Sequence, residues 1–359
     1  MKKILISVLA VLLAANVFAG GKKETQESAG GAAEIKAGFI YDASIHDQGF
    51  SEAHDKGRLA LERLGYKTAY VENVAENADC EKAIRDLIDQ GCNVIYTTSF
   101  GFMDWTLKVA EEFPDIKFAH CSGYKRAANM STFYAKIYQA WYLAGIAAGY
   151  KTKSGKLGYV AAFPIPEVIR HIDAWALGAQ SVNPDITVDV IWANTWNDPS
   201  VERQAATELL NRGCDVITHH QSTAASLLAG AERGAAAVGY AASTPDITGY
   251  LTAPLFNWEA FYVEDVEAIK AGTWSSRAYW KGLEAGAVLL DALTAANDSR
   301  AAAAIKAAQD RIASGSLDPF TGPVADQTGA VKIPAGTTPS DEDLWNLGWF
   351  VKGINGTIQ

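Results

Sequence analysis

The sequence predicts an α/β protein of two lobes, each built on a parallel β-sheet and joined to the other by a hinge. From residue 34 onward, apolar runs of strand length alternate with amphipathic runs of helical spacing, an order typical of parallel sheets. The roughly 325 residues of this part exceed one ordinary core and suffice for two. One short pattern also occurs twice, which indicates that the two lobes share local structure.

The N-terminal residues have the features of a secretory signal peptide, which we place at residues 1–19. Lys2 and Lys3 precede the apolar run 4–13, and Val17-Phe18-Ala19 supplies the cleavage pattern. The apolar run is far shorter than the roughly 20 residues that span a bilayer as a helix. We therefore expect export to the periplasm or another extracytoplasmic space. The alternative is an uncleaved signal that tethers the protein.

Residues 20–33 contain no large apolar side chain, and this composition predicts a flexible linker. A lipid anchor is not supported, because the first cysteine, Cys80, lies far beyond the cleavage point. Loss of the two lysines of the signal would change the formal net charge from −10 to −12. Such a charge disfavours binding to nucleic acid phosphates, so we expect no nucleic acid partner.

The repeated pattern reads LIDQGCNVI at residues 87–95 and LLNRGCDVI at residues 209–217. Each copy follows an amphipathic run, and its glycine is placed to end a helix before a strand begins. Cys92 and Cys214 should therefore occupy equivalent buried positions in the two lobes. A disulfide bond between Cys80 and Cys121 is the weaker alternative use of the cysteines.

The alternating pattern predicts eight strands, with helices between most of them. They are expected near residues 35–41, 67–71, 93–98, 116–121, 156–161, 187–192, 214–219 and 236–240. Extended segments near residues 130–135, 249–256 and 277–282 are expected to form the three-segment hinge. The first lobe would then comprise residues 34–132 and 256–279, and the second lobe residues 133–255 and 280–359 with a C-terminal extension.

Aromatic and amide side chains follow the ends of the predicted strands in both lobes. Ligands of open parallel sheets lie beyond these ends, and a base stacked on an aromatic ring contributes on the order of 1–3 kcal/mol. A planar heterocycle would suit these loops, although each aromatic could instead fill the space between sheet and helix. The loop residues are Tyr41-Asp42, Asp47 to Phe50, Ser99 to Phe102 (including Phe100) and Ser122 to Tyr124 in the first lobe, with Phe163 to Glu167, Asn194 to Trp196, His220 to Ser222 and Tyr240 in the second.

The motifs of common enzymes are missing from the sequence. It contains no G-x-S-x-G, no G-x-x-x-x-G-K-[ST], no G-x-G-x-x-G and no H-E-x-x-H motif. His219 and His220 are adjacent on or just after a strand, so their side chains should point to opposite faces and not bind one metal ion. We therefore expect no catalysis, no cofactor and no metal site, with an exported hydrolase or a metal-binding receptor as minority alternatives.

Several longer motifs are similar to the basic membrane protein family of ABC-transporter substrate-binding proteins, and specifically to its purine-binding branch. The similarity covers nearly all of the chain after the linker. The motifs that carry it are DQGF at 47–50, HDKGR at 54–58, FPIPEVIR at 163–170, LGAQSVNP at 177–184, NTWNDP at 194–199, Asn257-Trp258, Gly272-Thr273-Trp274 and SGSLDPFTGPVADQTG at 314–329.

This resemblance implies a type I periplasmic-binding-protein fold with two Rossmann-like lobes. It implies a ligand such as adenine, guanine, xanthine or a nucleoside, enclosed between the lobes and passed to an ABC permease in the inner membrane. A sugar or a flavin-like ring is the alternative cargo.

The resemblance also implies the binding residues. Phe50 and Trp196 would sandwich a purine ring, and Trp280 with Lys281 would close the floor of the pocket. The side chains near the polar edges of the ring would be Asp47, Gln221, Ser222 and Asn257, and the predicted set is completed by Tyr41, Phe100, Tyr124 and Trp258. The family usually has tryptophan in place of Phe50 and aspartate in place of Ser222, which leaves the exact ligand open.

Overall fold

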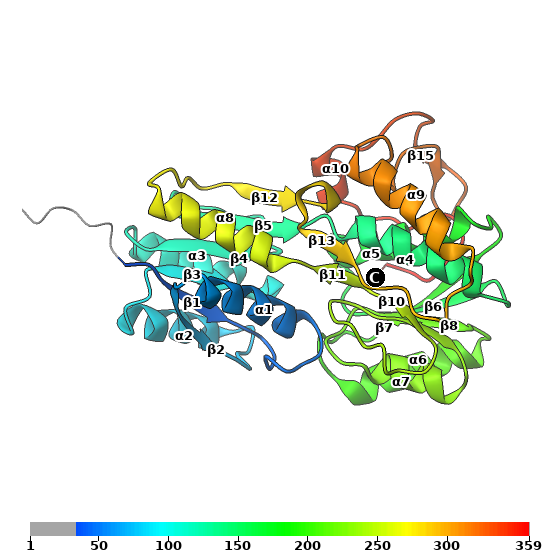
Figure 1. Ribbon diagram of the computed structural model, residues 1–359, viewed down its shortest axis with the longest axis horizontal. Helices are drawn as coiled ribbons and strands as arrows, with labels where there is room; N and C mark the ends of the chain where they lie inside the picture. Colours follow the sequence, from blue (N-terminus) through cyan, green and yellow to red (C-terminus); the bar gives the residue numbers. More distant parts are fainter. Residues whose placement is uncertain (1–33, 359) are drawn as a thin grey trace, which may run out of the picture. The chain divides into compact units, whose positions relative to one another are not determined.

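The computed structural model describes residues 34–358, of which the part from Ile35 onward belongs to one compact unit (Figure 1). The predicted signal peptide and linker lie outside the described residues. The unit contains two six-stranded sheets, and all neighbouring strands within each sheet are parallel. Among the described helices, none has the length and apolar character needed to cross a membrane.

The first sheet has the strand order β12-β5-β4-β3-β1-β2. Its strands are β1 (Lys36–Ile40), β2 (Lys67–Val71), β3 (Val94–Thr97), β4 (Lys117–Cys121), β5 (Met130–Ala135) and β12 (Ala278–Lys281). Successive strand residues alternate between two apolar cores, because side chains of a strand point to opposite faces. The helices of one face are α2 (Ala78–Asp89) and α3 (Met103–Glu112), and those of the other are α1 (Phe50–Arg63) and α8 (Trp258–Lys270).

The second sheet has the order β10-β9-β8-β6-β7-β16. Its strands are β6 (Lys156–Ala161), β7 (Thr187–Trp192), β8 (Val216–His219), β9 (Ala236–Val238), β10 (Tyr250–Thr252) and β16 (Ile354–Asn355). The helices of one face are α4 (Tyr138–Lys151) and α5 (Pro166–Gln180), and those of the other are α6 (Pro199–Asn211) and α7 (Ala225–Glu232). Both sheets are thus covered on both faces, as expected for parallel strands.

The repeated sequence pattern forms the same packing in both sheets. A Cβ atom on Gly38 of β1 or on Gly158 of β6 would lie 3.2 Å or less from three side chains of the neighbouring repeat. Glycine is needed at both positions because the repeat packs directly over the strand. The three side chains are Leu87, Cys92 and Ile95 in the first sheet and Leu209, Cys214 and Ile217 in the second. All four cysteines are buried free thiols, so the alternative disulfide between Cys80 and Cys121 is not formed.

The chain passes between the two sheets three times. It leaves the first sheet after β5, returns between β10 and α8, and leaves again after β12. These passages fall at the predicted hinge segments, whereas the exact limits of the two lobes stay a prediction.

The C-terminal part of the chain packs beside the second sheet. Helix α9 (Ala301–Ala313) packs on α4, and β16 joins the sheet edge next to β7. The remaining elements are β11 (Pro254–Phe256) paired with β13 (Val288–Leu290), β14 (Val324–Ala325) paired with β15 (Val331–Ile333), α10 (Asp341–Trp345), and the short helices η1 (Phe100–Phe102) and η2 (Leu283–Ala285).

Candidate functional site

A cavity lies where the carboxyl ends of the two sheets face each other. About 370 Å³ of space lies between its atoms, a figure that includes open solvent. Each lining residue follows a strand end or lies in the first turn of the helix after it. The lining residues are Asp42, Phe50, Ser99, Phe100 and Ser122 from the first half, and Glu167, Trp196, His220, Ser222 and Tyr240 from the second.

The two halves touch at the rim of this cavity. A Cβ atom on Gly49, at the start of α1, would lie 2.7 Å from the Cα atom of Ser222 in the loop after β8. The backbone N–H of Ser222 also donates to the carbonyl oxygen of Trp196 at 3.0 Å, which joins the loops after β7 and β8. The cavity is therefore closed on this side by backbone contact between its two walls.

Backbone strain is concentrated around the cavity. Gln48, Ser122, Asn194 and Ala241 have positive φ angles between 52° and 64°, and all four lie in loops after strands that end at the cavity. Such conformations cost non-glycine residues of order 1 kcal/mol each and are common at binding sites. The loops are thus held in shapes that local preference alone would not select.

The aromatic side chains of the cavity are held by neighbouring rings. Phe50 meets Phe256 and Trp258 edge-on, with ring centroids 5.4 and 6.1 Å apart. Trp196 lies beside Phe163 at 4.9 Å. Both Phe50 and Trp196 are half-buried and keep one part of the ring toward the cavity.

Each half also contributes one carboxylate to the cavity. Asp42 accepts a hydrogen bond from the Ser51 hydroxyl at 3.2 Å, and Glu167 accepts one from the Tyr134 hydroxyl at 2.7 Å. Burial, assisted by the nearby Glu76, raises the pKa of Asp42 from 3.8 to about 6. No lysine or arginine is among the described residues that line the cavity. The site therefore favours ligands that donate hydrogen bonds and disfavours ligands that carry phosphate groups.

Four residues of the predicted binding set line the cavity, namely Phe50, Phe100, Trp196 and Ser222. The carboxylate of Asp47 instead accepts hydrogen bonds of 2.8 to 3.0 Å from the backbone N–H groups of Gly49, Ser51 and Glu52, and it thereby caps helix α1.

Two further predicted residues are buried near the cavity without lining it. The hydroxyl of Tyr41 donates to Asp55 at 3.4 Å. The side-chain oxygen of Gln221 accepts from the backbone N–H of His220 at 3.2 Å, while its amide nitrogen has no partner in the structure.

The remaining predicted residues lie outside the cavity lining. Tyr124 is 68% exposed, and the Asn257 amide donates to the carbonyl oxygen of Gly286 at 2.8 Å. Trp258 is buried and stacks on His54 with ring centroids 4.4 Å apart.

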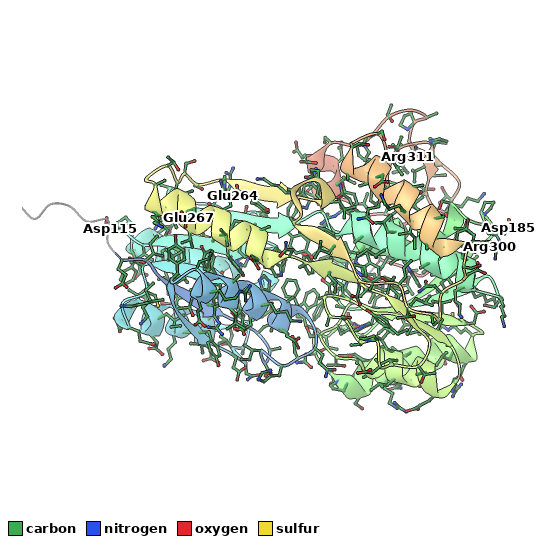
Figure 2. The ribbon with its side chains drawn as sticks, viewed as in Figure 1. Asp115, Asp185, Glu264, Glu267, Arg300 and Arg311 are labelled. Atoms are coloured by element: carbon green, nitrogen blue, oxygen red, sulfur yellow. The ribbon has the colours of Figure 1, made fainter. Side chains whose placement is uncertain are left out.

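The two residues predicted for the pocket floor also have other partners. Trp280 lies 5.0 Å from Trp345, measured between ring centroids. Lys281 forms an ion pair of 2.8 Å with Glu264 of α8, which Figure 2 labels.

Six lining residues were not in the predicted binding set: Asp42, Ser99, Ser122, Glu167, His220 and Tyr240. All six lie in segments that follow predicted strand ends, five of them in loops and Glu167 in the first turn of α5. The position of a strand end locates such a segment but does not determine its side-chain directions, so the residues that face the cavity were not identifiable from the sequence.

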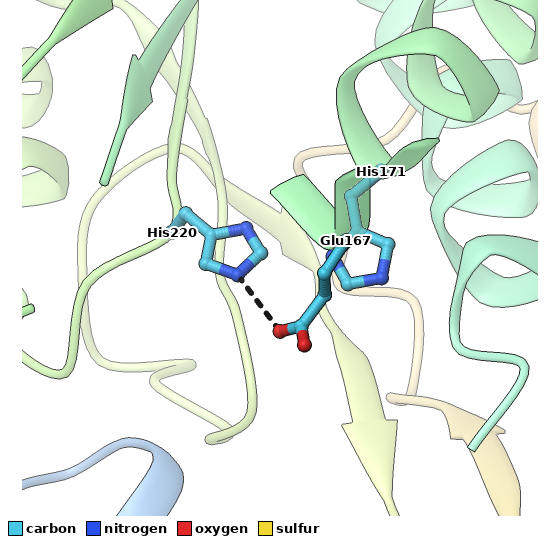
Figure 3. Close-up of side chains that lie close together, drawn as sticks. All are labelled: Glu167, His171 and His220. Carbon is cyan, nitrogen blue, oxygen red and sulfur yellow. Dashed lines mark ion pairs between the residues drawn. The ribbon is translucent and has the colours of Figure 1, made fainter. Parts of the chain in front are cut away.

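Glu167 and His220 lie close to a third titratable side chain, His171 of α5. One ligand atom from each lies within 4.8 Å of the others, so these three could hold a metal ion (Figure 3).

Comparison with known proteins places this chain in a family. Residues 34–316 match the family described as ABC transporter substrate-binding protein PnrA-like. A purine-binding protein of Brucella abortus is 39% identical, with 98% of this chain and 99% of that protein covered. A putative ABC transporter glucose-binding protein of Haloferax volcanii is 36% identical, with coverage of 94% and 85%.

Solved structures show the same fold. An ABC transporter solute-binding protein from Conexibacter woesei has a TM-score of 0.67 at 23% identity, over 79% of this chain and 98% of that chain. The two parallel sheets thus form the type I periplasmic-binding-protein fold that the sequence predicted. The family is one of extracytoplasmic substrate-binding proteins rather than enzymes, and its members take a small-molecule ligand and work with a permease. This chain belongs to the PnrA-like family of ABC transporter substrate-binding proteins.

Proposed function

We propose that this protein binds a purine base or nucleoside in the cavity between its two halves and passes it to an ABC permease in the inner membrane. It catalyses no reaction itself, and a signal peptide at residues 1–19 exports it. The observation that carries the proposal is that Phe50 and Trp196, from opposite halves of the chain, line one cavity.

The polar groups that line the cavity are complementary to a purine base or nucleoside. The carboxylates of Asp42 and Glu167 accept hydrogen bonds, and purine bases carry ring N–H and amino donors. A nucleotide is disfavoured because no basic side chain among the described lining residues would balance its phosphate. The expected ligand is therefore uncharged, flat and rich in hydrogen-bond donors.

Closure follows from contacts in both halves. A ligand that touches Phe50 and Trp196 together gains more binding free energy in the closed state than in an open one. It therefore shifts the population toward the closed state, which the permease would recognise.

The two relatives suggest different cargo. The relative from Brucella abortus, named as purine-binding, supports the proposal over nearly the whole chain. The relative from Haloferax volcanii is named as a putative glucose-binding protein and makes a sugar the second candidate. Sugars also stack on aromatic rings, so the cavity aromatics alone do not separate the two.

Native mass spectrometry of the purified protein would identify a co-purified ligand by its mass. Titration calorimetry with adenine, guanine, xanthine, a nucleoside, riboflavin and glucose would then rank the candidates. We expect a purine or nucleoside to bind at least tenfold more tightly than glucose, which corresponds to about 1.4 kcal/mol. Tighter binding of glucose or riboflavin, or binding of no purine, would overturn the proposal.

A further inference from the structure

We propose that Glu167, His171 and His220 form a site for one divalent cation of the zinc type in the wall of the cavity. The proposal concerns the cation alone and does not depend on which solute the cavity takes. The sequence did not predict this site, because the adjacent pair His219 and His220 offered no common ligand position. The structure instead brings His220 to the side chains of helix α5.

The fold places the three side chains around one point. Glu167 and His171 are four residues apart on α5, so they lie on the same face of the helix. His220 follows β8, and its ring centroid lies 5.0 Å from that of His171. Figure 3 shows the side chain of Glu167 in front of the His171 ring, with its carboxylate directed toward His220. The Nε2 atom of His220 lies 3.8 Å from Oε1 of Glu167.

Three of the four imidazole nitrogens in this cluster have no hydrogen-bond partner in the structure. They are Nδ1 and Nε2 of His171, which is 0% exposed, and Nε2 of His220, which is 2% exposed. A buried polar atom without a partner destabilises the folded protein, because its hydrogen bond to water is lost and not replaced. A bound cation would use one lone pair of each ring and remove most of this cost.

Two neighbouring hydroxyl groups can orient the ligands of a metal site, while the buried guanidinium of Arg170 places a positive charge near the same cluster. The Tyr159 hydroxyl lies 3.1 Å from Nδ1 of His220, which leaves Nε2 of the same ring for a cation. The Tyr134 hydroxyl donates to Glu167 at 2.7 Å. Partners of this kind commonly orient metal ligands and hold their tautomer.

The donor set selects the class of cation. Two imidazole nitrogens with one carboxylate are typical of zinc sites that keep an open fourth position, whereas Mg²⁺ prefers oxygen ligands. Glu167 and His220 line the cavity, so the open position would face its interior. A water molecule or a ring nitrogen of the solute would complete the coordination.

The test is calorimetric titration of the chelator-treated full-length protein with Zn²⁺, and in parallel with Mg²⁺. We expect one Zn²⁺ per chain and no measurable uptake of Mg²⁺. Glu167→Gln and His171→Phe should each weaken Zn²⁺ binding by about tenfold or more, since each removes one ligand. His219→Phe is the matched control, because His219 is also buried and adjacent to His220 but not in the cluster. It should leave the affinity within about twofold.

Titration of the unmodified protein with Co²⁺ keeps the test decisive if a variant fails to fold. Intense visible absorption is expected from a four-coordinate site with nitrogen and oxygen ligands. Absence of stoichiometric Zn²⁺ binding to the unmodified protein would overturn the proposal and leave buried water as the partner of the histidines. Zn²⁺ binding that survives both substitutions would also overturn it. Failure to bind purines, with Zn²⁺ binding intact, would refute only the proposed cargo.

Discussion

Replacement of Gly49 by alanine tests whether the two halves must touch at the rim for tight binding. The new Cβ atom would lie 2.7 Å from the Cα atom of Ser222 and 3.0 Å from its Cβ and carbonyl oxygen. Carbon atoms pack at about 3.5–4.0 Å, so the two loops must move apart by about 1 Å. Two of these three atoms belong to the backbone, so rotation of a side chain cannot relieve the contact.

The expected loss of affinity follows from this displacement. A gap of about 0.5–1 Å removes a quarter to a half of a dispersion contact. Stacking on Phe50 and Trp196 contributes on the order of 1–3 kcal/mol for each ring. Gly49→Ala should therefore cost about 0.5–3 kcal/mol of binding free energy, which corresponds to a dissociation constant roughly 2-fold to 140-fold higher.

Calorimetric titration with the tightest-binding purine or nucleoside measures this change. Gly348→Ala is the control, because the nearest atom to its new Cβ would lie 3.8 Å away. The melting temperature of the ligand-free protein should stay nearly constant in both variants, since an open state relieves the contact. Unchanged affinity in Gly49→Ala would show that the contact between Gly49 and Ser222 has no part in enclosing the ligand.

Three further predictions concern other side chains of the site. Phe50→Ala and Trp196→Ala should each weaken ligand binding by about 1–3 kcal/mol with little change in melting temperature. Trp258→Ala, at a buried position, should instead lower the free energy of unfolding by about 3–5 kcal/mol. Equal melting temperatures for the three variants would contradict the assignment of Phe50 and Trp196 to ligand binding and of Trp258 to the core. Asp42→Asn should stabilise the ligand-free protein by up to about 3 kcal/mol at pH 7.5. Burial raises the pKa of the Asp42 carboxyl from 3.8 to about 6, so the unmodified protein has its full stability below pH 3.8 and loses part of it as the pH rises through 6. At pH 4 the carboxyl is mostly protonated in the folded protein, and urea unfolding should show almost no gain for Asp42→Asn over the unmodified protein. A gain of the same size at both pH values would rule out ionisation as its cause. Asp47→Ala should cost about 0.5–2 kcal/mol in thermal unfolding, because three backbone N–H groups at the start of α1 lose their acceptor. An unchanged melting temperature would instead leave Asp47 free to act in ligand binding.

The sequence by itself determined the two-sheet architecture of this protein. Strand and helix periods are set by local backbone geometry, so β1, β6 and the other predicted strands lie where apolar runs placed them. The repeated Gly-Cys pattern indicated equivalent packing in both halves, which Cys92 and Cys214 show beside Gly38 and Gly158. The loops that surround the cavity were also identifiable, because they follow strand ends.

Only the tertiary structure decided which side chains of those loops face the cavity. Asp47 and Ser222 lie in loops of the same kind, yet one caps a helix and the other lines the cavity. His171 and His220 meet because α5 packs on one face of the second sheet beneath the end of β8, a contact that no local pattern encodes. Side-chain direction in a loop depends on residues that are distant in the chain, and their positions follow from packing of the whole fold.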